Sequence, residues 1–138
     1  MDHPYVDHSG PATVQDARWS NEPRPGLHRE LAPGTVVFEP ADVAHEVAHA
    51  FGMSVELLLS PERTRHVSEA RDAAAWLLFG HTRMGFEALS RALGRNDHST
   101  ALRACQRAAK RRQEDSWFRD VTDRLERKLE QKAKGVAA

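Results

Sequence analysis

Two short motifs contain side chains that could act on a ligand. His45-Glu46-Val47-Ala48-His49 spells HExxH, in which two histidines one helical turn apart can bind zinc while the glutamate acts as general base. The second motif, Asp97-His98-Ser99-Thr100, places four polar side chains at the start of a predicted helix. Such side chains can form hydrogen bonds with base edges in the major groove of DNA. The first motif is typical of a metalloprotease and the second of a DNA-binding protein.

The rest of the sequence argues against the metalloprotease. A catalytic zinc needs a third protein ligand, and Val55 occupies the position where a metzincin would supply it. Glu69 is the other candidate, but it lies on a helix with a different predicted role. Five-residue motifs also match often by chance. A zinc metalloprotease using His45, Glu46 and His49 is therefore a remote alternative, and we expect no enzyme activity, no cofactor and no metal site.

The elements that would position these side chains are predicted to be helices. Apolar residues recur with helical spacing from residue 41 onward, which predicts helices near 41–51, 55–59, 64–81, 86–93, 97–112 and 116–129. The fourth and fifth of these helices, joined by a turn containing Gly94, form a helix-turn-helix. Thr64, Asp97 and Ser116 are the predicted N-caps. The fold class is all-α, a compact bundle of about six helices.

Small and apolar residues define the inner faces of these helices. Trp76 and Phe79 widen the apolar surface of the third helix, which makes it the central one. Cys105 is interpreted as a small buried hydrophobic residue rather than a reactive thiol. The positions expected to face the core are Ala44, Val47, Ala48, Phe51, Val67, Ala70, Ala74, Leu77, Leu78, Phe86, Leu89, Leu93, Ala101, Ala104, Cys105, Ala108, Phe118, Val121, Leu125 and Leu129.

Composition indicates one domain behind an irregular arm. The chain has 138 residues, 40% hydrophobic and 29% charged, enough for one modest core. Its longest apolar run, residues 73–79, is too short to span a bilayer, and one cysteine fits a reducing cytoplasm. Residues 1–40 hold six of the seven prolines and are predicted to be the arm. Residues 41–133 form the domain and 134–138 a tail.

Net charge is zero, but it is unevenly distributed. Residues 1–40 carry three arginines against six acids, whereas residues 63–112 carry 11 basic against 4 acidic side chains. Clustered positive charge attracts polyanions such as DNA. A solvated basic helix face would give the same count, so charge alone leaves the two interpretations open.

The segment Leu58–Cys105 resembles, without a gap, the C-terminal helix-turn-helix domain of the bacterial replication initiator DnaA. The anchors are LLS-x-x-R-[ST]-R, then V-x-x-x-R, then D-H-S-T-x-L-x-x-C. The resemblance covers about residues 41–129 and implies a TrpR-like DnaA C-terminal architecture. No G-x-x-x-x-G-K-[ST] loop occurs in the sequence, so we expect a free-standing DNA-binding protein without ATPase activity.

The resemblance also implies which residues contact DNA. Asp97, His98 and Ser99 would contact bases in the major groove, and Thr100 would lie near a phosphate. Arg103 would bind a phosphate through its guanidinium fork. The full predicted set is Arg63, Arg65, Arg71, Asp97, His98, Ser99, Thr100 and Arg103.

The three arginines near the start of the long helix have their own predicted contacts. Arg63 would enter a narrow minor groove, where the negative potential is enhanced. Arg71 matches a phosphate-contacting arginine of the family, and Arg65 would add a phosphate contact from the same loop.

Several positions depart from the family pattern. Pro61 and Glu62 replace basic residues, and Asp72 replaces a polar residue that contacts the phosphate backbone. Phe79 replaces a common lysine, and Glu87 stands where proline is frequent. Acids introduced beside a phosphate backbone should weaken DNA binding or shift it to other sequences.

These observations predict sequence-specific binding of double-stranded DNA at DnaA-box-like sites, which would regulate replication initiation or transcription. We expect a cytoplasmic, nucleoid-associated protein with no membrane contact. The alternative is a helical adaptor that keeps the fold and binds a protein, such as the initiator, with the N-terminal arm as a contact surface.

Overall fold

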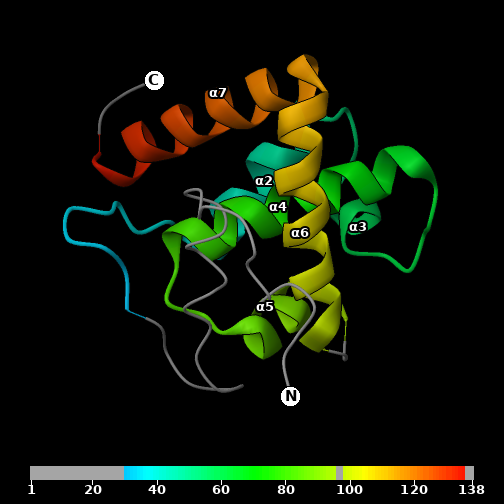
Figure 1. The fold of residues 1–138 in the computed structure, drawn as a ribbon, viewed down its shortest axis with the longest axis horizontal. Coiled ribbons are helices and arrows are strands. Elements are labelled where there is room, and N and C mark those ends of the chain that lie inside the picture. The colour runs from blue at the N-terminus through cyan, green and yellow to red at the C-terminus, as the bar shows by residue number, and fades with distance from the viewer. Residues whose placement is uncertain (1–29, 96–97, 136–138) are drawn as a thin grey trace, which may run out of the picture.

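The computed structural model describes residues 30–95 and 98–135, with the side chain of His98 outside the description. Within these residues the chain forms helices and no strand (Figure 1). The all-α prediction is thereby confirmed. The helices are α2 (Pro40–Ala50), α3 (Val55–Leu58), α4 (Arg65–His81), α5 (Phe86–Ala92), α6 (His98–Glu114) and α7 (Ser116–Ala133).

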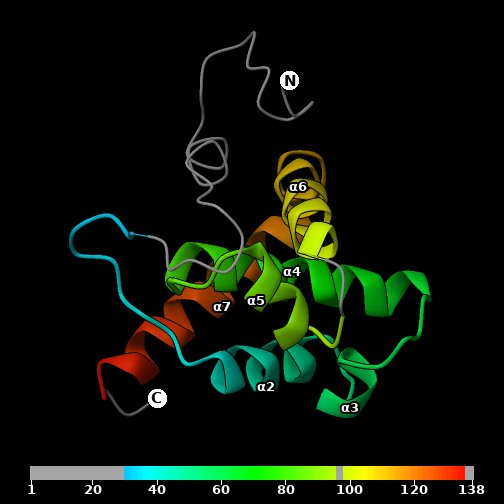
Figure 2. The ribbon, with the colours of Figure 1, turned by 90° about the horizontal axis from the view of Figure 1, so that it is seen from below.

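Helix α4 is the central element, as its apolar surface predicts. It packs against each of the other five described helices. Figure 2 shows α4 between α6 on one side and α2 on the other, so the bundle has three layers at this point. Helix α7 follows α6 and packs on α6, α4 and α2. The N-terminal parts of α4 and α6, on or beside which the predicted DNA contacts lie, are therefore held by the same core.

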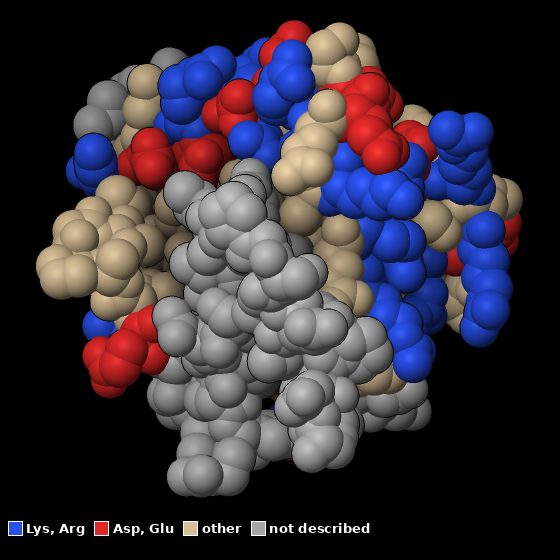
Figure 3. Space-filling view, in the orientation of Figure 1, with Lys and Arg blue, Asp and Glu red and all other residues tan. Residues whose placement is uncertain are grey.

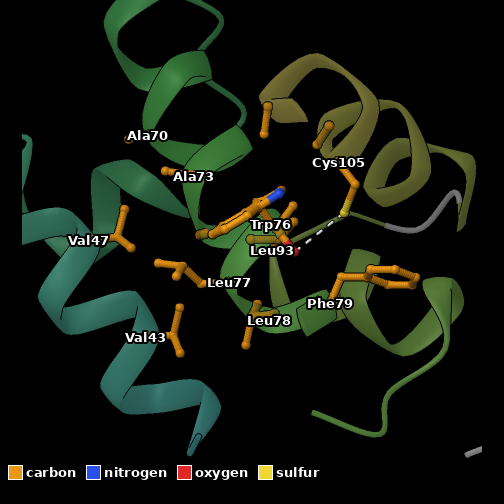
Figure 4. Close-up of a cluster of buried hydrophobic side chains, with 14 of the residues drawn as sticks. Val43, Val47, Ala70, Ala73, Trp76, Leu77, Leu78, Phe79, Leu93 and Cys105 are labelled. Atoms are coloured by element: carbon orange, nitrogen blue, oxygen red, sulfur yellow. Dashed lines mark hydrogen bonds between the residues drawn. The ribbon is translucent and has the colours of Figure 1, made fainter. Parts of the chain in front are cut away.

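The core contains nearly all the positions predicted from helical spacing. Those of α4 and α6 are all buried, and so are Trp76, Phe79 and Cys105. Figure 4 shows Trp76 between α4 and the helix that carries Cys105, whose Sγ lies 3.4 Å from the Ala75 carbonyl oxygen. On α2 the stripe is rotated slightly, because Val43 is fully buried while Ala44 is only half-buried. The larger side chain occupies the deeper position.

Two predicted helix caps differ from those observed. Thr64 is the N-cap residue of α4, but its side chain makes no capping hydrogen bond. Ser116 is not the N-cap of α7. Asp115 occupies that position, and its carboxylate accepts from the backbone N–H groups of Trp117 and Phe118. An ionised carboxylate at an N-cap also interacts favourably with the helix dipole. The predicted cap Asp97 lies outside the described residues.

Within the described part of the predicted arm, Val36 and Phe38 contact the end of α4, and the last residue predicted for the arm, Pro40, begins α2. Phe38 is buried, its N–H donates to the His81 carbonyl oxygen at 2.9 Å, and its ring stacks on the His81 imidazole. The division into arm, domain and tail stays a prediction, since residues 1–29 and 136–138 lie outside the description.

Candidate nucleic-acid interface

The turn between α5 and α6 is built on a glycine. Gly94 has φ +80°, and a Cβ added there would lie 2.4 Å from the Leu59 carbonyl oxygen. Only glycine accepts both the left-handed backbone and this close approach. Ser90 of α5 fixes the other side of the turn, because its Oγ accepts from the Ala101 N–H of α6 at 3.0 Å. The helix-turn-helix geometry is thus set by α5 and by the loop after α3.

A basic cleft of about 530 Å³ lies between the start of α4 and one face of α6. Five of the predicted DNA-binding residues line it, although they come from two segments, 63–71 and 100–103, that are distant in sequence. Figure 3 shows Lys and Arg side chains gathered over α6 and the start of α4. The predicted residues in the cleft are Arg63, Arg65, Arg71, Thr100 and Arg103, and the cleft also contains Arg95, Arg107 and Arg111.

Sequence reasoning missed the three additional arginines of the cleft. Arg103, Arg107 and Arg111 recur every fourth residue along α6, and this spacing places them on one face of the helix. The helical period was the signal that could have identified them. Arg95 follows Gly94 directly, so its position depends on the glycine turn.

Arg71 is a buried cation that anchors the loop before α4. Its Nε donates to the Leu58 carbonyl oxygen at 2.7 Å, and its terminal nitrogens donate to the carbonyl oxygens of Glu62 and Ser60. Burial lowers the pKa of Arg71 from its usual value, and the neighbouring cations Arg95 and Arg63 lower it further. Three of its five N–H donors are thus used on the loop.

Asp72 lies beside Arg71 but is buried beneath α6. Its side chain is 1% exposed, and Arg107 binds both carboxylate oxygens, at 3.0 and 3.2 Å. Arg111 lies 3.5 Å from the same carboxylate and 3.3 Å from Glu69, which in turn accepts from Arg65 at 3.1 Å. Burial raises the pKa of Asp72, and this effect exceeds the opposing attraction of Arg107 and Arg111.

The predicted effect of Asp72 on DNA binding is therefore revised. It was expected to face the phosphate backbone as an introduced acid, but its carboxylate is enclosed by two arginines. Glu87 pairs with Arg91 at 2.9 Å, and Phe79 is buried against Phe86 with ring centroids 5.0 Å apart. Of the departures from the family pattern, only Pro61 and Glu62 lie in the exposed loop beside the cleft.

The first turn of α6 is described only in part. Ser99 and Thr100 are half-buried there, and Thr100 lines the cleft. Asp97 and the side chain of His98 lie outside the described residues. Their predicted contacts with bases stay predictions.

The HExxH motif on α2 does not form a metalloprotease centre in the described structure. His45 and His49 are exposed, whereas Glu46 is buried against α7 and pairs with Lys128 at 3.0 Å and Lys132 at 3.3 Å. Although burial raises the pKa of Glu46, hydrogen bonds from the two lysines outweigh it and hold the pKa below its usual value. A carboxylate held by two lysines is not available as a general base beside His45 and His49.

Comparisons with known proteins agree with the geometry. The model of the bacterial DnaA protein helix-turn-helix matches residues 40–108. The chromosomal replication initiator protein DnaA of Caulobacter vibrioides is 36% identical over 88 residues, which are 64% of this chain and 18% of that protein. The DnaA of Synechocystis is 32% identical over 80 residues, 58% of this chain and 18% of that protein. The chain spans less than a fifth of the length of these relatives.

The match includes α2 to α5 and α6 as far as Ala108, so it contains the glycine turn and all the cleft residues except Arg111. A helix-turn-helix of this type is a DNA-binding unit and is not itself catalytic. No described helix is long and apolar enough to cross a membrane. The family match, the all-α fold and the basic cleft together assign this chain to the bacterial DnaA helix-turn-helix family.

Proposed function

We propose that this chain binds double-stranded DNA sequence-specifically at DnaA-box-like sites. The observation that supports this most directly is the basic cleft, because Arg63 before α4 and Arg103 on α6 line the same hollow. The start of α6 would enter the major groove while Arg63 enters the adjacent minor groove. The two contacts would grip one duplex from both sides of a phosphate backbone.

The cleft residues would divide into two groups during binding. Arg63, Arg65 and Arg103 are exposed and can reach phosphates or bases directly. Arg71 donates mainly to carbonyl oxygens of the loop, so its proposed role is to hold Arg63 in position. A direct contact between Arg71 and a phosphate stays a prediction. Phosphate contacts supply affinity and register, whereas the turn Asp97–Thr100 would supply sequence preference.

We further propose that binding requires no nucleotide and regulates replication initiation or transcription by occupying sites that an initiator also uses. The adaptor alternative has less support than the sequence suggested, because it relied partly on Asp72 and Glu87. Both acids are paired with arginines of the domain itself. A protein partner for the N-terminal arm stays a prediction.

The test is a fluorescence anisotropy titration of a DnaA-box duplex and a scrambled duplex over a series of salt concentrations. We expect tighter binding to the box duplex and a steep loss of affinity with salt, since each phosphate contact releases about 0.9 counterion. Arg63→Ala should weaken box binding by about 1–3 kcal/mol. Arg91→Ala is the matched control, because Arg91 is exposed but is not among the residues that line the cleft.

A His98→Ala variant separates sequence preference from general affinity. It should lower the preference for the box duplex more than it lowers binding to the scrambled duplex. Equal losses on both duplexes would restrict His98 to positioning the helix. Binding to neither duplex at low salt would overturn the proposed function and favour the adaptor.

A further inference from the structure

Two acids of α4 and three arginines form one connected network of ion pairs at the basic cleft. Glu69 accepts from Arg65 at 3.1 Å and lies 3.3 Å from Arg111. Asp72 is bound by Arg107 at 3.0 Å and lies 3.5 Å from Arg111. Arg111 directs one terminal nitrogen to each acid. The two acids therefore share this cation, while each also has an arginine of its own.

The three arginines differ in how far they are open to solvent. The side chain of Arg65 is 87% exposed and that of Arg107 is 52% exposed, whereas that of Arg111 is 24% exposed. The Arg111 guanidinium also lies over the Phe118 ring, 5.5 Å from its centroid, and an aromatic face attracts a cation in this position. Arg111 is therefore the inner arginine of the network. Arg65 and Arg107 are the outer arginines, which a ligand in the cleft reaches first.

A phosphate in the cleft would compete with the acids for the outer arginines. A phosphate beside Arg107 attracts the charge that neutralises Asp72. A phosphate beside Arg65 does the same to Glu69. The Asp72 side chain is 1% exposed and that of Glu69 is 16% exposed, so a carboxylate left without a cation at either position is costly. With Arg111 in place, each acid keeps one cation when its outer arginine turns to a phosphate.

We propose that Arg111 is a positioning residue for DNA binding, which stays on the two acids while the two outer arginines turn to phosphates of the duplex. This inference rests on the proposed function, and its partner is the phosphate backbone of double-stranded DNA. Arg111 would thus raise DNA affinity without contacting DNA itself. The residues matched by the DnaA helix-turn-helix model end at residue 108, so this arginine lies outside the family match.

The test is a double-mutant cycle of Arg111→Gln and Asp72→Asn. Fluorescence anisotropy measures the affinity of each variant for the box and scrambled duplexes over a series of salt concentrations, and circular dichroism checks that each variant is folded. Arg112→Gln is the matched control. Arg112 is the next residue of α6, its guanidinium also lies over an aromatic ring, and it is not among the residues that line the cleft.

We expect Arg111→Gln to weaken DNA binding and to reduce the slope of log affinity against log salt concentration by about 1–2 in magnitude. The reason is that one or both outer arginines stay on their acids, and each lost phosphate contact removes about 0.9 from the slope. Asp72→Asn should raise affinity by about threefold more in the Arg111→Gln background than in wild type, since it releases Arg107 from an acid that has lost its other cation. Arg112→Gln should change neither the slope nor the effect of Asp72→Asn.

A direct contact between Arg111 and a phosphate would give the opposite coupling. Asp72→Asn would then release Arg111 as well as Arg107, so it would raise affinity more in wild type than in the Arg111→Gln background. A gain that is equal in the two backgrounds, or larger in wild type, overturns this inference while the proposed function stands. If wild type shows no salt-sensitive binding to either duplex, the proposed function fails and this inference fails with it.

Discussion

Asp72 on α4 and Glu46 on α2 are both buried carboxylates held by two cations of a neighbouring helix, but their environments differ. The Asp72 side chain is 1% exposed and lies between α4 and α6, against Arg107 and Arg111. Arg107 and Arg111 also line the basic cleft, together with Arg63. Asp72 therefore sets the position of side chains that belong to the proposed interface.

Glu46 lies on the other side of α4, between α2 and α7. Its side chain is 9% exposed, and its two oxygens are paired with Lys128 and Lys132. Lys132 also lies 3.6 Å from Asp42 of the same helix α2. Lys128 and Lys132 pair with acids of α2, so opposite charges join this pair of helices.

Buried acids therefore have two different roles in this fold. At Asp72 burial dominates and raises the pKa, whereas at Glu46 the lysines dominate and lower it. Planar arginine forks can bind a carboxylate and still direct remaining N–H groups outward, but a lysine ammonium is a point charge. The first arrangement organises an interface and the second holds two helices together.

The largest expected effect is at Arg71, on the cleft side. Arg71→Met should lower the free energy of unfolding by about 2–4 kcal/mol, because three carbonyl oxygens lose a buried charged donor. Its box-DNA affinity should fall as well, because the loop carrying Arg63 loses its anchor. Urea denaturation measures the loss of stability, and fluorescence anisotropy measures the loss of DNA affinity.

Arg91→Met is the control. It removes the same charge from an exposed position and should lower the free energy of unfolding by about 0.5 kcal/mol. Equal stability losses in the two variants would contradict the anchoring role.

The next largest effect is expected when the two acids are each replaced by their amide. Asp72→Asn removes a negative charge beneath the cleft and frees Arg107 for phosphate, so affinity for scrambled DNA should rise by about 0.5–1.5 kcal/mol. Glu46→Gln should leave DNA binding unchanged and lower stability by about 1–2 kcal/mol. Anisotropy at two salt concentrations separates the outcomes. An equal change of DNA affinity in both variants would remove the distinction between the two sides.

Lowering the pH should change the contributions of Glu46 and Asp72 to stability in opposite directions. The Glu46 pKa lies below its ordinary value of 4.5 in the folded protein. Its contribution to stability is present above 4.5 and is lost as pH falls through the folded pKa. The Asp72 pKa lies above its ordinary value of 3.8, so its contribution is fully present below 3.8 and is lost as pH rises through the folded pKa.

Unfolding midpoints measured from neutral to acid pH test these signs. As pH falls, wild type should lose its stability advantage over Glu46→Gln and gain stability relative to Asp72→Asn. If the stability difference between wild type and Glu46→Gln changes with pH in the same direction as that between wild type and Asp72→Asn, the opposite pKa shifts of the two acids are wrong.

These contrasts also show which parts of the molecule could be predicted from sequence. The inner face of α4 follows from apolar spacing alone, and Val67, Ala70 and Leu77 are buried as predicted. The cap of α7 was misplaced by one residue because Asp115 and Ser116 are both good N-caps. Local pattern does not choose between two adjacent candidates of this kind.

The arrangement of the candidate site depends on contacts that no local pattern contains. Asp72 and Arg107 are 35 residues apart, and their pairing requires the crossing of α4 and α6. Without that crossing, Asp72 is an acid beside phosphate-binding residues, which is how the sequence was interpreted. The resemblance to DnaA placed Arg63 and Arg103 at one DNA site, and the structure places both in one cleft.

The smallest expected effect is at Lys128, on the side away from the cleft. Lys128→Met keeps most of the aliphatic stem and removes one of the two cations of Glu46. Because Lys132 lies 3.3 Å from the other Glu46 oxygen and the Lys128 side chain is 46% exposed, the loss of stability should be only about 0.5 kcal/mol. Box-DNA affinity should stay at the wild-type value, since Glu46 pairs with this lysine on a surface that contributes no residue to the cleft. A fall in DNA affinity comparable to that of Arg63→Ala would show that DNA also contacts α7, and the distinction between an interface side and a structural side of α4 would then fail.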